Sequence, residues 1–445
     1  MSIMKKVAIH NLGCKVNAYE AEAMEENLEN NGYEIVSFTE FADIYIVNTC
    51  VVTNVASRKS RQMLNKAKKN NPEAIIVAAG CYAHNMEQEK SIDDIVDVII
   101  GNNNKKDLVH ILSTLQTKSK TKISNEEASK IVVDINNTAE FENLQIAKLR
   151  ERTRINIKIQ DGCNQFCSFC IIPLVRGRVR SRNIEDVLLE VDGLAKNGCK
   201  EVVLTGINLS SYGIDLDNRP TILDLIVRIH VINGIERIRL GSLEPGLITD
   251  DFVKALSRLE KFCPHFHLSL QSGCDNTLKR MNRNYSNTEY LDKCKLIRKY
   301  FDHPSITTDV IVGFPGETEE EFLTTRNFVE KVGFHETHIF KYSKREGTKA
   351  AKMSDQVSSK DKNSRSEDLI KLGERQKNEF EKHYIGREVQ VLVEGKAKLG
   401  NKEYYVGHTK EYLKVYIDTK KDISNQVIHG KLHYLDGNNL GICIN

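Results

Sequence analysis

The 445-residue sequence lacks several features that would assign it to a class at once. It has no apolar run near the ~18 residues that suggest a membrane span, and its first residues run directly into a strand-like pattern. Its eleven cysteines are odd in number and spread along the chain, unlike the dense, even set of a small disulfide-stabilised secreted protein. We therefore expect a cytoplasmic protein in a reducing compartment, where clustered thiols hold metals or do redox chemistry.

A charge of one dominant sign is also absent. The 64 Lys and Arg residues nearly balance 61 Asp and Glu, which gives a formal net charge of +3. This average does not say whether basic residues are concentrated locally. The length corresponds to about three domains of ~150 residues each.

Three regions with different patterns follow one another along the chain. Residues 1–115 alternate short apolar runs with polar helical stretches, which predicts βα units around an open, mainly parallel sheet. Residues 116–149 contain neither Gly nor Pro, show little periodicity and are interpreted as a linker. Residues 150–376 repeat the βα alternation six times, which predicts a partial (β/α)6 barrel followed by a helical stretch after Ser343. Residues 377–445 consist of short alternating strands and predict a small β-barrel, so the fold class is α/β with a C-terminal β-barrel.

The most informative motif is a C-x3-C-x2-C loop formed by Cys163, Cys167 and Cys170, directly after the first strand of the second series. Such a loop can wrap three thiolates around a 4Fe-4S cluster and leave one iron open, whereas a purely electron-carrying cluster is normally held by four ligands. Zinc is the competing metal, but it usually has paired C-x2-C units or a His partner, and neither is nearby. Purely structural thiols are usually buried among apolar residues, and this loop is polar.

Three further cysteines each follow a predicted strand. Cys14, Cys50 and Cys81 are separated by 36 and 31 positions. They can converge because all carboxyl ends of a parallel sheet lie along one edge. One thiol at a strand end would mean little, since cysteines are common in buried strands, but three favour a second three-thiolate cluster. The other five are interpreted as core or incidental residues: Cys199, Cys263, Cys274, Cys294 and Cys443.

The C-x3-C-x2-C spacing, with an aromatic residue before the last cysteine, resembles the signature of radical S-adenosylmethionine (SAM) enzymes. This resemblance implies that the open iron binds SAM, that SAM is cleaved to a 5'-deoxyadenosyl radical, and that the protein binds and orients the reactants. Barrel enzymes place their chemistry at the carboxyl ends of strands. The predicted SAM pocket therefore contains Phe169, Thr205, Gly206, Asn208, Ser269, Gln271, Asp309 and Gly313.

With two three-cysteine sets, nearly the whole chain resembles the methylthiotransferase family. That family combines an N-terminal three-cysteine α/β domain, a radical SAM barrel and a C-terminal TRAM β-barrel that binds nucleic acid. The stretch LGCKVN at residues 12–17 resembles the MtaB branch, whereas the MiaB branch typically reads closer to YGCQMN and the RimO branch to LGCPKN. The resemblance implies two 4Fe-4S clusters held by Cys14, Cys50, Cys81, Cys163, Cys167 and Cys170, which would be the metal-binding and catalytic residues.

The branch resemblance also implies a reaction, methylthiolation of carbon 2 of N6-threonylcarbamoyladenosine at tRNA position 37. One SAM would supply the radical, sulfur would come from the N-terminal cluster, and a second SAM would supply the methyl group. The implied partners are the tRNA anticodon loop, an electron-donor protein or other reductant and a sulfur source, with no membrane. The alternatives are the same chemistry on isopentenyladenosine tRNA or a ribosomal protein, and a non-catalytic iron-sulfur protein that binds RNA.

Basic residues are concentrated in three places that could contact RNA. Arg176, Arg178, Arg180 and Arg182 alternate with other residues after the cysteine loop, so an extended segment would present all four guanidinium groups on one face, suited to phosphate oxygens. Residues 58–69 carry six basic residues and no acid, which is equally typical of a solvated helix face. From residue 382 onward, ten Lys or Arg stand against seven Asp or Glu, interleaved with four tyrosines of which we expect half in the core.

Overall fold

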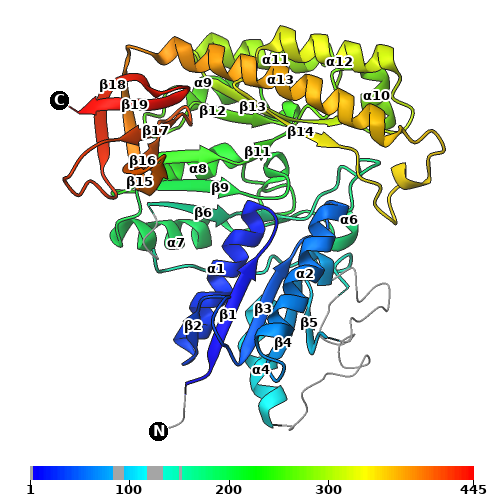
Figure 1. Ribbon diagram of the computed structural model, residues 1–445, viewed down its shortest axis with the longest axis vertical. Coiled ribbons are helices and arrows are strands. Elements are labelled where there is room, and N and C mark those ends of the chain that lie inside the picture. The colour runs from blue at the N-terminus through cyan, green and yellow to red at the C-terminus, as the bar shows by residue number, and fades with distance from the viewer. Residues whose placement is uncertain (1–3, 84–94, 118–133, 150–152, 445) are drawn as a thin grey trace.

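The computed structural model describes residues 4–83, 95–117, 134–149 and 153–444, which form three parts (Figure 1). The N-terminal part is a five-stranded parallel sheet in the order β2-β1-β3-β4-β5. Its elements are β1 (Lys6–Asn11), α1 (Lys15–Asn30), β2 (Glu34–Val36), β3 (Ile44–Thr49), α2 (Asn54–Asn70), β4 (Ile75–Gly80), β5 (Val98–Ile100), η1 (Lys105–Asp107) and α4 (Leu108–Thr117). Every residue of the central strand β3 is buried, as expected for a parallel sheet covered on both faces.

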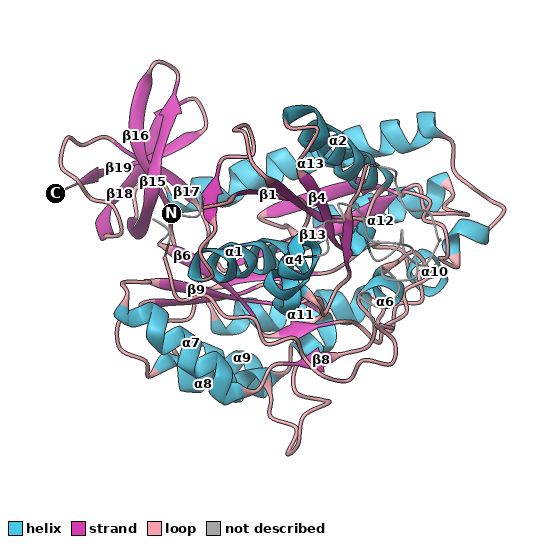
Figure 2. Ribbon diagram, turned by 90° about the horizontal axis from the view of Figure 1, so that it is seen from below, coloured by secondary structure: helices cyan, strands magenta, loops and turns pink. Residues whose placement is uncertain are grey.

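The central part is a partial barrel made of two sheets, β10-β9-β6 and β11-β12-β13-β14, with helices on the outside (Figures 1 and 2). Its strands are β6 (Arg154–Lys158), β9 (Glu201–Thr205), β10 (Arg237–Leu240), β11 (Ser242–Leu243), β12 (His265–Leu268), β13 (Ser305–Val312) and β14 (Glu336–Lys341), with the short pair β7 (Gln160–Asp161) and β8 (Arg180–Ser181). Its helices are α6 (Ile172–Val175), α7 (Ile184–Lys196), α8 (Ile222–His230), α9 (Asp250–Leu256), α10 (Asp275–Arg280), α11 (Asn287–Tyr300), α12 (Glu319–Val332) and the single turns η2 (Leu209–Ser211) and η3 (Pro245–Leu247). The six long strands confirm the predicted βα series.

Alternation along these strands gives the central barrel a polar interior. In β10, Ile238 and Leu240 belong to the hydrophobic core that includes residues of α7 and α8, so Arg237 and Arg239 lie on the opposite, inner face. Val203 pairs in register with Arg239 and therefore shares that face. Barrel interiors are commonly filled by bulky branched apolar side chains. Here the apolar layer lies outside the strands, and charged groups occupy the interior.

The C-terminal part is a closed barrel in the order β15-β16-β17-β19-β18, which confirms the predicted small β-barrel. Its strands are β15 (Glu388–Leu399), β16 (Lys402–His408), β17 (Lys414–Ile417), β18 (Val427–Asp436) and β19 (Asn439–Ile444). The helix expected directly after Ser343 begins later, because residues 344–358 contain only the turn η4 (Ala350–Lys352) and Ser358 caps the start of α13 (Ser359–Tyr384). The boundary expected at residue 377 falls inside α13.

The C-terminal barrel is held against the central barrel by buried arginines. Arg237 donates to the His408 carbonyl at 2.7 Å, and Arg239 donates to the Lys410 carbonyl at 2.8 Å. The ring of Tyr412 stacks on His265, with ring centroids 4.9 Å apart. The loop of residues 408–412 therefore reaches into the polar interior of the central barrel.

The predicted linker is described only over residues 134–149; its remainder, apart from residues 116–117 of α4, lies outside the described residues. Leu144 and Ile146 are buried in the core of the central barrel, and the Tyr19 hydroxyl of α1 donates to the Leu144 carbonyl at 2.5 Å. This part of the linker therefore packs between α1 and the barrel. Among the described helices, none combines the length and the apolar character that a membrane crossing requires.

Two buried histidines predict that acid destabilises the fold. Burial lowers the pKa of His335 to about 3 and holds that of His265 well below its usual value, so the folded chain binds fewer protons than the unfolded chain between roughly pH 6.5 and pH 3. Stability is therefore complete above pH 6.5 and falls with pH below it, by about 1.4 kcal/mol per pH unit and histidine. We expect His335→Gln to reduce the loss of unfolding free energy between pH 7 and pH 5 by about 2 kcal/mol, measured by urea titration.

The matched control is His429→Gln, which removes an exposed histidine from the C-terminal barrel. This control should keep the pH dependence of the wild-type protein. Equal pH dependence in the His335 variant and the wild type would contradict the prediction.

Candidate functional site

The cysteines of the N-terminal sheet lie at one edge of it. β1, β3 and β4 are neighbours, and Cys14, Cys50 and Cys81 follow their carboxyl ends within three residues. A Cβ atom placed on Gly13 would lie 3.2 Å from the Cys50 sulfur, so the loop before Cys14 lies against Cys50. Gly80 has a φ of +88°, and a Cβ there would meet the Asn48 side-chain oxygen at 2.6 Å. Local backbone geometry thus requires glycine immediately before Cys81. We call these three cysteines the N-terminal triad.

The N-terminal triad has polar hydrogen-bond donors around it. The Arg176 Nε atom lies 3.3 Å from the Cys81 sulfur, and the Asn102 Nδ2 atom lies 3.6 Å from it. Burial raises the pKa of the Cys14 thiol and raises that of Cys50 to about 11. A thiol that binds metal must lose its proton, and donors such as Arg176 stabilise the negative sulfur.

The cysteines of the C-x3-C-x2-C loop, which we call the loop triad, lie between β7 and α6 at the carboxyl end of β6. The Arg283 Nη1 atom donates to the Cys167 sulfur at 3.1 Å, and the Asn208 Nδ2 atom lies 3.8 Å from the Cys163 sulfur. Burial raises the pKa of the Cys170 thiol to about 12 and also raises that of Cys163. Both triads are therefore faced by N–H donors; Cys50 and Cys81 are buried, the loop triad is half-buried and Cys14 is exposed.

The spacing of the sulfur atoms favours a cluster over a single metal ion. Tetrahedral zinc with Zn–S bonds of ~2.3 Å would bring its sulfur ligands to about 3.8 Å from one another. In the described part of the chain, neither triad has its three sulfur atoms all within 4.8 Å of one another. The side-chain oxygen of Asn208, beside Cys163, is buried and has no hydrogen-bond partner. Three thiols per site, wide spacing and this free acceptor fit a 4Fe-4S cluster with a further ligand next to it.

Three of the predicted SAM-pocket residues lie together next to the loop triad. Thr205 is the last residue of β9. The next residue, Gly206, packs against Gln160, and a Cβ atom on Gly206 would lie 2.9 Å from the glutamine side chain. The same glutamine accepts from the Asn208 backbone N–H at 2.7 Å. This packing fixes the turn that brings Asn208 to Cys163.

The other predicted SAM-pocket residues form two groups. Across the interior, the Gln271 backbone donates to the Asp309 carbonyl at 2.9 Å, and the Ser269 carbonyl accepts from Tyr285, whose ring lies under Arg283. Separately, Phe169 contacts Phe314 edge-on at 6.4 Å between ring centroids, next to Gly313. A cavity of about 610 Å³ beside Cys167 is lined by Gln165, Glu244 and Arg283 among others, and by none of the eight predicted residues.

Three of the four arginines predicted to contact RNA are buried. Arg176, Arg180 and Arg182 have 0%, 0% and 1% of their surface exposed, whereas Arg178 remains accessible and lies over the Phe166 ring at 4.4 Å. The prediction of a common exposed face was wrong for these three, because residues 180–181 pair with residues 160–161 as an internal ribbon. Their guanidinium groups instead find buried carboxylates.

Arg182 pairs with Glu190, and the carboxylates that Arg176 contacts belong to an ion cluster between the N-terminal sheet and the central barrel. Its members are Glu20, Lys105, Lys158, Asp161 and Arg176. Arg176 Nη1 lies 2.9 Å from the Glu20 carboxylate and 3.0 Å from that of Asp161. Burial alone would raise the pKa of Glu20, but Arg176, Lys105 and Lys158 hold it well below its usual value. Both carboxylates are thus ionised, and the cluster joins α1 to the loop triad's segment.

Comparison with known proteins agrees with this arrangement. Residues 157–329 match the radical SAM superfamily, and residues 6–101 match the uncharacterized protein family UPF0004. The threonylcarbamoyladenosine tRNA methylthiotransferase MtaB of Bacillus subtilis (strain 168) is 38% identical over 96% of this chain and 94% of its own length. The chain belongs to the radical SAM methylthiotransferase family. Membership confirms the predicted cofactors, 4Fe-4S clusters and SAM, for this methylthiotransferase.

Other relatives carry a different substrate name. The tRNA-2-methylthio-N(6)-dimethylallyladenosine synthase of Finegoldia magna (strain ATCC 29328 / DSM 20472 / WAL 2508) is 34% identical over 94% of this chain and 90% of its own length. Among solved structures, the radical SAM methyltransferase TsrM from Kitasatospora setae, with cobalamin and a [4Fe-4S] cluster bound, gives a TM-score of 0.54 at 16% identity, covering 76% of this chain and 75% of TsrM. That likeness supports the fold of the methylthiotransferase.

Two residues beside the triads were missed by the sequence interpretation. Arg283 donates to Cys167 from a position 116 residues away, and Asn102 donates to Cys81 from the end of β5. The position of Asn102, directly after a predicted strand of the N-terminal sheet, was a usable signal, since that strand ends at the same edge. Nothing local in the sequence marks Arg283.

The ion cluster predicts a large effect of one neutral substitution. Glu20→Gln would leave Lys105, Lys158 and Arg176 buried with only one carboxylate among them. Breaking a buried pair in this way costs about 3–5 kcal/mol. We expect a loss of this size in the unfolding free energy, together with faster amide hydrogen exchange in α1.

The control for this prediction is Glu185→Gln, which breaks an exposed pair with Arg228. Exposed pairs contribute little, so this variant should unfold and exchange like the wild type. A Glu20→Gln protein as stable as the control would contradict an energetic role for the ion cluster.

Proposed function

We propose that this methylthiotransferase converts N6-threonylcarbamoyladenosine at tRNA position 37 to its 2-methylthio derivative. The observation that carries the proposal is the presence of two three-cysteine sites connected through Arg176, which contacts Cys81 and follows the loop triad closely in the chain. The MtaB name of the Bacillus subtilis relative and the LGCKVN stretch support the substrate. A non-catalytic iron-sulfur protein would need closed clusters, and each triad supplies only three thiols.

Each triad has a separate task in this proposal. Cys163, Cys167 and Cys170 would hold the cluster that reduces SAM, and Cys14, Cys50 and Cys81 would hold the cluster from which sulfur is inserted. When bound, these groups supply the radical and the sulfur, and a second SAM supplies the methyl group. The protein's own residues orient them: Asn208 and Arg283 face the loop triad, while Asn102 and Arg176 face the N-terminal triad. The reaction also needs an electron donor and a sulfur source, and we place it in the cytoplasm.

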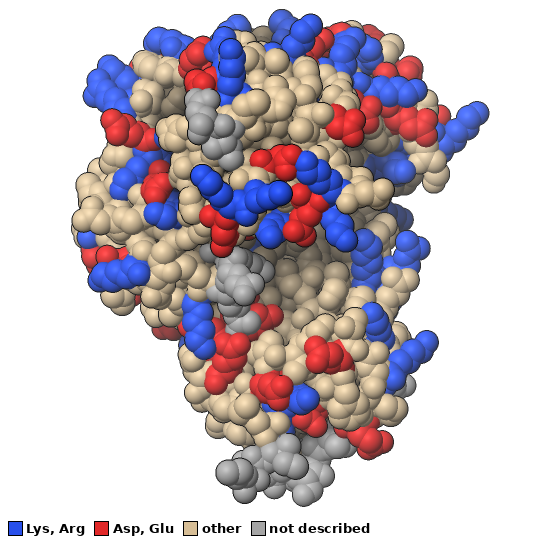
Figure 3. Space-filling view, turned by 60° about the vertical axis from the view of Figure 1, so that its left-hand side comes forward, with Lys and Arg blue, Asp and Glu red and all other residues tan. Residues whose placement is uncertain are grey.

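The RNA is proposed to bind through exposed basic residues rather than through a single charged field. Arg178, next to the loop triad, and the basic face of α2 remain accessible. The C-terminal barrel adds exposed lysines, while Tyr405 and Tyr416 are buried in it. Figure 3 shows Lys and Arg interspersed with Asp and Glu on the face drawn. We therefore expect the anticodon loop to be held by several separate contacts.

The substrate is tested directly by nucleoside mass spectrometry of tRNA from a strain that lacks this protein. Threonylcarbamoyladenosine without the methylthio group should accumulate, and a plasmid copy of the gene should restore the modified nucleoside. Loss of 2-methylthio-isopentenyladenosine instead would reject the threonylcarbamoyl substrate and assign the protein to the other branch.

The division of labour is tested by cysteine variants. Anaerobically reconstituted protein should hold about eight irons, and Cys14→Ala should hold about four. We expect this variant to cleave SAM while inserting no sulfur, whereas Cys163→Ala should lose both reactions. Cys443→Ala, which changes an exposed cysteine outside both triads, is the matched control and should keep all eight irons. Loss of SAM cleavage in a folded Cys14→Ala protein would contradict the proposed roles.

A further inference from the structure

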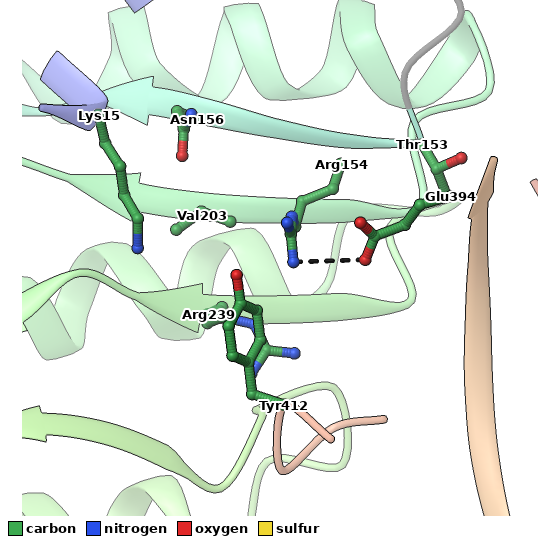
Figure 4. Close-up of a pocket in the computed structure, with 8 residues that line it drawn as sticks. All are labelled: Lys15, Thr153, Arg154, Asn156, Val203, Arg239, Glu394 and Tyr412. Atoms are coloured by element: carbon green, nitrogen blue, oxygen red, sulfur yellow. Dashed lines mark ion pairs between the residues drawn. The ribbon is translucent and has the colours of Figure 1, made fainter. Parts of the chain in front are cut away.

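A cavity of about 300 Å³ lies in the polar interior of the central barrel (Figure 4). Lys15 lines one end of it, Glu394 of the C-terminal barrel lines the other, and Tyr412 lies between them beside Arg239. In the chain, Lys15 directly follows Cys14 of the N-terminal triad. Arg154 and Arg239 extend into it from β6 and β10. We call it the lumen cavity.

The walls of the lumen cavity carry more positive than negative charge. Arg154 lies 3.3 Å from Glu394, and Arg239 lies 2.7 Å from Glu201 of β9, so these two arginines have carboxylate partners. The Lys15 ammonium points into the cavity and has neither an ion pair nor a hydrogen bond to any described residue. Lys15 is an exposed residue whose side chain lines this cavity, and a bound anion would give its ammonium an ionic partner.

We propose that the lumen cavity binds the carboxylate of the threonylcarbamoyl group, with Lys15 as its ionic partner. This inference rests on the proposed function, which supplies a substrate whose modified base ends in an amino-acid carboxylate. Lys15 is also the sequence neighbour of Cys14, one of the three cysteines from which sulfur would be delivered to the same base. Arg154 and Arg239 surround the carboxylate with further positive charge, and Tyr412 contributes its hydroxyl to the lining.

The same cavity disfavours the substrate of the other branch. A dimethylallyl group is apolar, so inserting it would desolvate Lys15 and the arginines without supplying any hydrogen bond. A backbone phosphate is also a poor occupant, because the RNA chain continues on both sides of it and would have to pass through the cavity. A side group on a base has a free end that can enter alone. Relatives with both substrate names have similar identities to this chain. The charge of the cavity therefore distinguishes the substrates where overall identity does not.

The test measures binding of anticodon stem-loops to cluster-loaded protein, without turnover. One stem-loop carries threonylcarbamoyladenosine at position 37, a second carries unmodified adenosine, and a third carries the threonyl group as its methyl ester. Wild-type protein should bind the acid more tightly than the other two. Lys15→Met should weaken binding of the acid roughly tenfold or more, the usual worth of a charge-assisted hydrogen bond, and leave the other two unchanged. Lys15→Arg should retain most of the preference.

A variant with the opposite effect separates this role from damage to the fold. Glu394 is the only carboxylate among the residues that line the cavity in the described structure, and it would repel the substrate's carboxylate. Glu394→Gln should therefore strengthen binding of the acid severalfold, which a merely destabilised protein would not do. Lys200→Met removes an equal charge from an ion pair with Glu236 outside the cavity and should bind all three stem-loops like the wild type. Iron content and circular dichroism confirm that each variant is loaded and folded.

Two outcomes would overturn the inference. If Lys15→Met weakens binding of all three stem-loops equally, Lys15 contacts the RNA backbone. If wild-type protein does not distinguish the acid from its ester, the lumen cavity does not read the carboxylate. Either result leaves the proposed function intact, because that function is judged separately by the tRNA nucleosides of the deletion strain.

Discussion

A guanidinium group buried between two domains needs carboxylate partners next to it, and the ion pairs that Arg176 forms determine much of this structure. Its partners are Glu20 of α1 and Asp161 of β7. The N-terminal sheet and the central barrel therefore pack together in the arrangement that brings both carboxylates to Arg176. The ion cluster contains three cations and two carboxylates. Its surplus positive charge lies toward Cys81, where a thiolate would balance it. The same arginine therefore pairs with the carboxylates of the interface and stabilises a thiolate at Cys81 of the N-terminal triad.

Strand direction explains why two separate domains can present their cysteines to each other. All strands of the N-terminal sheet are parallel, so its three cysteines share an edge, and the loop triad follows β6 at the carboxyl end of a second parallel set. Joining the two edges brings both triads to one interface. The cost is a set of buried charges, which are tolerated because each has a hydrogen-bonded partner.

Much of this arrangement could be predicted from local patterns. Apolar runs separated by helical stretches indicated the parallel sheets, and cysteines directly after those runs indicated their common edge. The four alternating arginines were misread because alternation shows that side chains share a face, not whether that face is outside. One carboxylate partner of Arg176 is Glu20, 156 residues away, and no local pattern connects them. In contrast, the polar interior could have been predicted, since RINIK, RIRL and HFHL alternate charged or polar residues with apolar ones.

The contact between the two barrels limits how the chain can be divided. Arg237 and Arg239 donate to backbone carbonyls of the loop at residues 408–410, so these bonds do not depend on which side chains the loop carries. They constrain the path of the loop rather than its sequence. A C-terminal barrel transplanted from a distant relative would need the same backbone path, or Arg237 and Arg239 would lose these carbonyl acceptors and Arg239 would keep only its ion pair with Glu201. The C-terminal barrel and the central barrel are in this sense a single inherited unit.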